Sequence, residues 1–172
     1  MTLTRQAEIA ANLDRVETQI AQACEAAGRA RDEVTLIAVT KTYPASDAEI
    51  LAELGVADVG ENRHPEAERK KSETRADLRW HFLGGLQTNK AAAVAKYADM
   101  VHSVDRPKLV RALNQGAESA GRLLDCLVQV DFDTTDPGRA GVEPDKALEL
   151  ADLVSQSDPL PLAGGGPIGK LG

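Results

Sequence analysis

Five short runs of β-forming residues alternate with helical patterns along this chain of 172 residues, and this alternation limits the fold more than any other feature. The runs are residues 34–39, 56–60, 78–83, 100–104 and 123–132. Strands that alternate with helices of this length predict βαβ units and a parallel sheet, which is an α/β architecture. We count five units and the start of a sixth at residues 161–163. A closed barrel of eight such units usually needs about 200 to 250 residues, so the chain is short for that fold.

Capping and turn residues set the expected boundaries of the helices. Apolar residues from 9 to 27 recur at spacings of three and four, which predicts a long first helix that Gly28 closes. The final helix is expected to begin at Pro144 and to cover one side with apolar residues that include Leu148. The expected N-caps are Ser46 (with Glu49 as its capping-box partner), Asn62 (with Pro65 in the first turn) and Asp105.

Composition excludes several classes of protein. A net charge of −7 and only five aromatic residues argue against a surface for nucleic acid or anionic membranes. Arg69, Lys70 and Lys71 lie among glutamates, which predicts a solvated helix face. Cys24 and Cys126 lie far apart without metal-ligand spacing, so we expect small buried side chains. No apolar run approaches about 18 residues and the first residues lack a leader pattern, which favours a cytoplasmic protein.

The chain changes character after residue 156. We expect a partial barrel over residues 1–156, followed by a Gly/Pro-rich segment at 157–172 that is either a disordered tail or an altered C-terminus. A strand that starts at 161–163 is not expected to continue through the glycines at 164–166. Residues 164–170 also fit G-x-x-x-x-G-K, but Leu171 stands where a P-loop needs serine or threonine, so a phosphate loop is not expected.

The first run ends on Lys41, and Pro44 stops the strand. Alternation places Ile37, Val39 and Lys41 on one face of a strand that we expect to be buried on both faces. In a barrel the functional side chains lie at the carboxyl ends of the strands, which is where Lys41 falls. The alternative is an ordinary lysine whose stem covers apolar surface while its ammonium group reaches water.

Three segments at the carboxyl ends of consecutive runs carry a family resemblance. They are residues 38–44 (AVTKTYP), 60–63 (GENR) and 80–90 (WHFLGGLQTNK), and residues 102–105 (HSVD) add a fourth. Together they resemble the pyridoxal phosphate homeostasis proteins, which are single-domain relatives of the alanine racemase barrel. The resemblance runs from the first helix to about Val154. It implies a TIM-type (β/α) barrel, incomplete here, with about five units and the start of a sixth.

The resemblance implies a cofactor, pyridoxal 5′-phosphate, and three residues that bind it. Lys41 matches the lysine that holds the cofactor as a Schiff base, and partial burial among Ile37 and Val39 would favour its neutral, nucleophilic form. Asn62 matches a cofactor-side asparagine, although it also suits a helix cap. We also expect His81 to be a cofactor-binding residue. The alternative is that it is a hydrogen-bonded histidine of the core.

The chain departs from the family at the phosphate-binding end. Relatives hold the phosphate with loops after the late strands and with an arginine in a V-R-I-G type of segment, and this sequence contains neither. Arg139 stands where relatives often carry a lysine near the site. A guanidinium group cannot form a Schiff base, so Arg139 would at most attract phosphate.

Three functional hypotheses stay open. The preferred one is an intracellular pyridoxal phosphate carrier or buffer that performs no catalysis. The second is a Schiff-base enzyme of the racemase or aldolase type, although the sequence shows no clear second base. The third is an incomplete barrel with impaired cofactor binding, whose exposed sheet edges would favour self-association.

Overall fold

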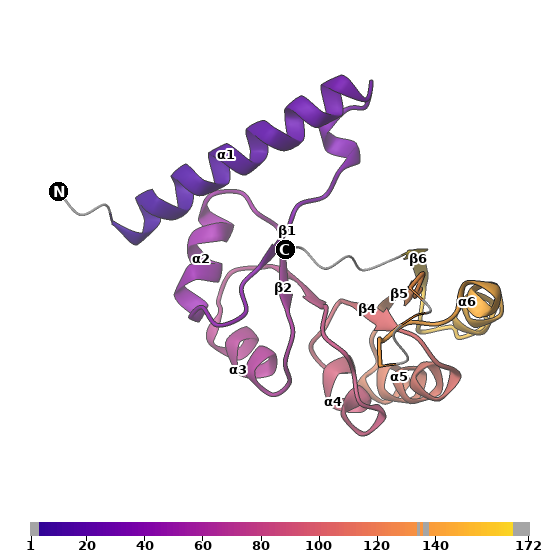
Figure 1. Ribbon diagram of the computed structural model, residues 1–172. Coiled ribbons are helices and arrows are strands. Elements are labelled where there is room, and N and C mark those ends of the chain that lie inside the picture. Colours follow the sequence, from indigo (N-terminus) through magenta and orange to yellow (C-terminus); the bar gives the residue numbers. More distant parts are fainter. Residues whose placement is uncertain (1–3, 134, 136–137, 167–172) are drawn as a thin grey trace.

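The computed structural model describes residues 4–133, 135 and 138–166, and its strands form one parallel sheet. The strands are β1 (Ile37–Val39), β2 (Asp58–Glu61), β3 (Arg79–Phe82), β4 (Met100–Val104), β5 (Asp125–Gln129) and β6 (Leu162–Gly166), and they pair in chain order. They follow an arc, and within the described residues β1 and β6 do not pair with each other, so the barrel is not closed (Figure 1). The expected α/β class and parallel sheet are confirmed.

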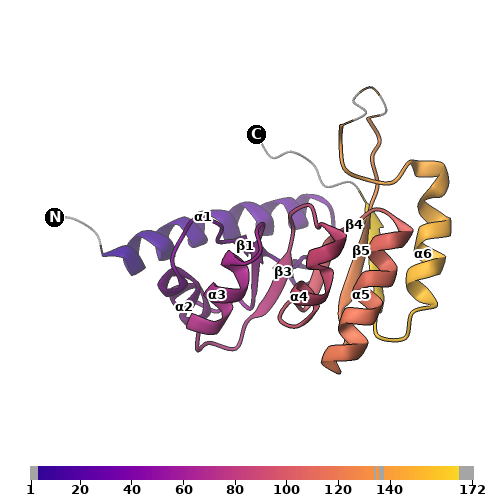
Figure 2. The same cartoon turned by 90° about the horizontal axis from the view of Figure 1, so that it is seen from below.

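Helices cover the convex side of the arc. They are α1 (Arg5–Ala26), α2 (Ala45–Glu53), α3 (Glu66–Glu73), α4 (Ala91–Ala95), α5 (Pro107–Ala120) and α6 (Ala147–Ser155), with short 3-10 turns η1 (Arg31–Glu33), η2 (Thr88–Lys90) and η3 (Pro144–Lys146). Figure 2 shows α3, α4 and α5 in front of the strands, whereas α1 lies beside β1 and α2 (Figure 1). As expected, Gly28 follows the end of α1, and it has a left-handed backbone (φ +65°) that glycine adopts at little cost.

The main core lies between the strands and helices α4, α5 and α6. Its large members are fully or almost fully buried: Phe82, Val101, Val104, Leu109, Val110, Leu113, Leu124, Cys126, Val128, Leu150, Val154 and Leu160. Both cysteines are free and buried, which confirms that prediction. A smaller cluster under α2 contains Ala48, Val59, Leu78 and Trp80. The outer face of the sheet is therefore the apolar one.

Two strands are shorter and more exposed than the sequence predicts. The run at 34–39 contributes only the three residues of β1, and Val39 is 46% exposed, so burial on both faces was wrong. The run at 123–132 is reduced to β5, and Leu123 and Phe132 at its ends are both exposed. The physical reason is that β1 is the edge strand of an open sheet. Among the described residues it pairs with β2 only, so its other edge has no neighbouring strand and one of its faces stays open.

The predicted side-chain caps do not form. The observed N-caps of α2, α3 and α5 are Pro44, Pro65 and Arg106, and none makes a side-chain cap hydrogen bond. Two of the expected capping groups bind other partners, one distant in sequence and one adjacent. The Glu49 carboxylate accepts the backbone N–H of Ala76 at 3.3 Å, and the Asp105 carboxylate pairs with Arg106.

The glycine run forms a strand, contrary to expectation. Residues 164–166 of β6 pair with Leu127, Val128 and Gln129 of β5. Ladder hydrogen bonds use backbone groups alone, so an ordered neighbouring strand can overcome the poor strand propensity of glycine. Residues 167–172, which complete the G-x-x-x-x-G-K stretch, lie outside the described residues.

The two leucines Leu113 and Leu148 provide a matched test of this core. Leu113 in α5 is fully buried, whereas Leu148 in α6, which the sequence wrongly placed on the covered side, is 78% exposed. We expect Leu113→Ala to lower the free energy of unfolding by about 2–5 kcal/mol because it leaves a cavity. Leu148→Ala should change it by no more than about 0.5 kcal/mol. Urea denaturation of both variants measures the difference, and equal losses would contradict this placement of the core.

Candidate functional site

Lys41 and Asn62 lie at the same level at the carboxyl edge of neighbouring strands. Val39 of β1 pairs with Gly60 of β2, and two residues further along each strand are Lys41 and Asn62. The backbone N–H of Thr40 continues this ladder to the carbonyl of Gly60 at 2.9 Å. The structure therefore brings these two predicted site residues onto adjacent strand ends.

A close backbone contact brings the loop after β3 to the same edge. A Cβ atom on Gly84 would lie 2.0 Å from the carbonyl oxygen of Asn62, so only glycine fits at this position. Gly85 has open space around it. Gly84 thereby sets how closely the third segment approaches Asn62.

Lys41 is exposed, and the expected partial burial was wrong. Its flanking residue Val39 faces an open side of the sheet instead of a packed interior. No hydrogen bond or ion pair joins the Lys41 ammonium to another described residue. A groove of about 320 Å³ lies between α1, β1 and α2, and its lining includes Val39, Thr40 and Tyr43 but not Lys41. The amine is therefore free to react with a molecule that approaches from solvent.

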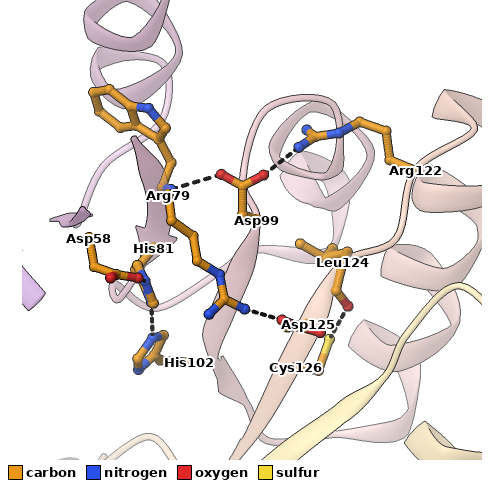
Figure 3. Close-up of polar contacts among 10 residues, drawn as sticks. Asp58, Arg79, His81, Asp99, His102, Arg122, Leu124, Asp125 and Cys126 are labelled. Carbon is orange, nitrogen blue, oxygen red and sulfur yellow. Dashed lines mark hydrogen bonds and ion pairs between the residues drawn. The ribbon is translucent and has the colours of Figure 1, made fainter. Parts of the chain in front are cut away.

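His81 lies deeper than Lys41 and Asn62. It pairs with Gly60, two residues before Asn62, which corresponds to roughly 6–7 Å along a strand. Its Nε2 lies 2.7 Å from Asp58 Oδ1 and its Nδ1 lies 2.9 Å from His102 Nε2 (Figure 3). Both ring nitrogens are thus engaged within the sheet, as the core-histidine interpretation expects.

A second polar layer lies below these histidines. Arg79 of β3 pairs with Asp125 of β5, and Asp99 accepts both the backbone N–H of Trp80 at 2.8 Å and Arg122 at 2.7 Å (Figure 3). These contacts join β3, β5 and the residues that precede β4 and β5 near the amino-terminal ends of the strands.

The His102 imidazole is held neutral. Burial, together with the smaller effects of the neighbouring His81 and Arg79, lowers its pKa to about 4. A neutral His102 can donate its Nε2–H to His81 Nδ1 while His81 donates Nε2–H to Asp58, which satisfies all three groups.

Arg139 is already paired with carboxylates. Its guanidinium group lies 2.9 Å from Asp133 Oδ2 and 3.7 Å from Asp131 Oδ1 in the loop after β5. Hydrogen bonds from Thr135, together with Arg139, hold the pKa of Asp133 below its usual range. Arg139 therefore joins two parts of the loop after β5 through ion pairs.

A buried ion pair that the sequence did not predict lies beside Lys41. Lys70 was expected on a solvated helix face, but it is 8% exposed and pairs with Glu61, which is 3% exposed. One signal was available: Glu61 has the outward parity of β2, where a helix covers the strand. A carboxylate in that position requires a cation.

The described part of the chain shows neither a metal-binding cluster nor a membrane-spanning helix. It contains no group of three or more His, Cys, Asp or Glu side chains arranged to hold a metal ion. None of the described helices has both the length and the apolar character needed to cross a membrane.

Comparison with known proteins identifies relatives over nearly the whole chain. The family model for the N-terminal domain of alanine racemase matches residues 11–165. The pyridoxal phosphate homeostasis protein of Mycobacterium tuberculosis H37Rv is 35% identical over 180 residues, an alignment that covers 93% of this chain and 69% of the relative.

Solved structures agree with the sequence match. PipY of Synechococcus elongatus PCC7942, a member of the COG0325 family solved with PLP bound, superposes with a TM-score of 0.79 and 32% identity, over 95% of this chain and 72% of PipY. The alanine racemase of Corynebacterium glutamicum superposes with a TM-score of 0.66 at 16% identity, over 92% of this chain and 42% of that enzyme, which supports the fold alone.

Gly84 and Gly85 allow a test of the close contact at the strand edge. We expect Gly84→Ala to lower the free energy of unfolding by about 1–3 kcal/mol, because its Cβ would overlap the Asn62 backbone. Gly85→Ala meets nothing within 4 Å and should be close to neutral. Thermal melting compares the two variants, and a Gly84→Ala protein as stable as Gly85→Ala would show that the contact is absent.

The low pKa of His102 predicts a loss of stability in mild acid. Its folded-state pKa of about 4 lies below the ordinary value of 6.5, so as the pH falls the unfolded chain takes up the proton first. The contribution of His102 is therefore present above about pH 6.5 and lost between there and pH 4. In His102→Gln, whose amide can still donate to His81, the fall in Tm over this range should be smaller by roughly 2–4 °C. An unchanged fall would contradict the assignment.

Proposed function

The chain belongs to the alanine racemase N-terminal domain family and, within it, to the pyridoxal phosphate homeostasis proteins, and from this premise we propose that it binds pyridoxal 5′-phosphate as a Schiff base on Lys41. The observation that carries the proposal is an exposed lysine amine, without a partner among the described residues, at the carboxyl edge of β1 and beside Asn62. The solved relative PipY, which has PLP bound, supports it.

The amine suits the aldehyde group of this cofactor. Pyridoxal phosphate supplies an aldehyde that condenses with an unprotonated primary amine and releases water. Lys41 offers an exposed primary amine that forms no ion pair with another described residue. We propose that Asn62, on the next strand end, contacts the cofactor, and that His81 supports the site from the layer below through its bonds to Asp58 and His102.

The arrangement favours binding over catalysis. Racemisation needs proton transfer on both faces of the bound substrate, and His81 already uses both ring nitrogens within the sheet. We therefore propose a carrier or buffer of pyridoxal phosphate. The cytoplasmic location, the lack of nucleic-acid binding and self-association through the sheet edges stay predictions.

Trapping with borohydride tests the proposal. We expect the purified chain, treated with pyridoxal phosphate and then borohydride, to carry one reduced adduct, located at Lys41 by peptide mass spectrometry. Lys41→Ala should lose this adduct, with at least a tenfold lower yield at one equivalent of cofactor, because the amine that reacts has been removed.

An exposed lysine elsewhere provides the control. Lys108 lies on α5, and Lys108→Ala should keep the full yield of adduct. Adducts spread evenly over the surface lysines, or a yield that Lys41→Ala does not reduce, would reject the proposal. A chain that melts cooperatively and forms no adduct would instead support the hypothesis of impaired binding.

A further inference from the structure

Three polar side chains are buried together between the sheet and α3. Thr40, Glu61 and Lys70 are 4%, 3% and 8% exposed, and they come from the end of β1, the end of β2 and the middle of α3. The Lys70 ammonium pairs with Glu61 Oε1, and the Thr40 hydroxyl donates to the same oxygen at 2.5 Å. This group, which we call the Thr40 anchor, lies on the helix-covered side of the sheet.

The anchor engages every polar group of Thr40. The backbone N–H donates to Gly60 O at 2.9 Å, and the hydroxyl donates to Glu61. The carbonyl oxygen accepts from Lys70 Nζ at 2.6 Å and from the backbone N–H of Tyr43 at 3.1 Å. Thr40 is therefore held by β2, by α3 and by the turn that follows it.

The carbonyl that Lys70 holds belongs to the peptide group that joins Thr40 to Lys41. A peptide group is planar, so fixing its oxygen also fixes the nitrogen and the Cα atom of Lys41. On the other side of Lys41, Thr42 has a left-handed backbone (φ +69°), which is uncommon for a residue with a branched Cβ. Because the Lys41 side chain has no partner among the described residues, its backbone sets where the amine can reach.

Stability alone does not explain a buried pair of this kind. Removing two charges from water costs several kcal/mol for each ion, and apolar replacements of buried pairs are often neutral or stabilising. The pair does, however, provide a specific geometry at one backbone carbonyl.

We propose that Glu61 and Lys70 are positioning residues for Lys41, which hold the Thr40–Lys41 peptide so that the amine meets the carbonyl carbon of its ligand. This inference rests on the proposed function of Lys41. It adds that the reactivity of an exposed amine toward pyridoxal phosphate is set by side chains buried between the sheet and α3.

A double variant removes the charges while keeping the shape of the anchor. In Glu61→Gln combined with Lys70→Met, glutamine can still accept the Thr40 hydroxyl, and methionine fills the space of the lysine stem but cannot bond the Thr40 carbonyl. Changing both residues avoids leaving one charge buried without its partner.

The neighbouring lysine offers a matched control. Lys71 also donates to a backbone carbonyl, that of Tyr97 at 2.7 Å, but this carbonyl lies at the end of α4 and away from β1. Lys71→Met therefore removes a similar bond from the same helix without touching the Thr40 anchor.

Two reactions of Lys41 distinguish a change in the position of its amine from a change in the exposure of its amine. We expect the double variant to form the borohydride-trapped pyridoxal phosphate adduct roughly 10- to 100-fold more slowly than the unaltered chain, as expected for a misplaced reacting group. Acetylation of Lys41 by acetic anhydride, followed by mass spectrometry, should keep its rate, because the amine stays exposed. Lys71→Met should leave both rates unchanged.

The outcomes distinguish this inference from the proposed function. If the unaltered chain forms no Lys41 adduct, the proposed function fails. If it does, and the folded double variant reacts at the same rate or Lys71→Met slows the reaction equally, the positioning role is overturned. If the double variant does not fold, Thr40→Val and Thr40→Ser decide: a several-fold slower reaction in the valine variant that serine restores supports the role, and equal rates reject it.

Discussion

Burial of the outer face of the sheet beneath α4, α5 and α6 is the interaction on which the rest of the structure depends. The large side chains from β3, β4 and β5 in this contact are apolar and almost completely buried, which supplies most of the driving force for folding. Because those helices hold the strands from behind, the concave face can carry Asp58, His81 and His102 without forming the core itself. The packing of apolar side chains on the outer face therefore allows the concave face to carry polar side chains.

Much of the fold could be predicted from the order of the elements. The alternation of β-forming runs with helical patterns gave the parallel sheet, and β4 was predicted with its observed boundaries. Local rules failed where tertiary partners competed. Glu49 binds the backbone of the α3–β3 loop instead of capping α2, and the glycines of β6 form a strand because β5 offers them a ladder. Neither outcome can be predicted from the residues that are nearby in sequence.

The candidate site could also be predicted only in part from the sequence. Lys41 and Asn62 could be placed at strand ends, because parallel strands bring their carboxyl ends to one edge. The exposure of Lys41 could not be predicted, since it depends on how the sheet ends. The partners of His81 also required the register between β2, β3 and β4. Lys70 was mistaken for a surface residue because its helix is otherwise rich in charge, and only the three-dimensional structure shows which charge points inward.

The position of β1 at the edge of the sheet has a chemical consequence for any bond made at Lys41. Among the described residues, the strand has a neighbour on one flank only, so water reaches the same nitrogen as an incoming aldehyde does. A carbon–nitrogen double bond formed there stays accessible to water, so hydrolysis can reverse the attachment of the aldehyde.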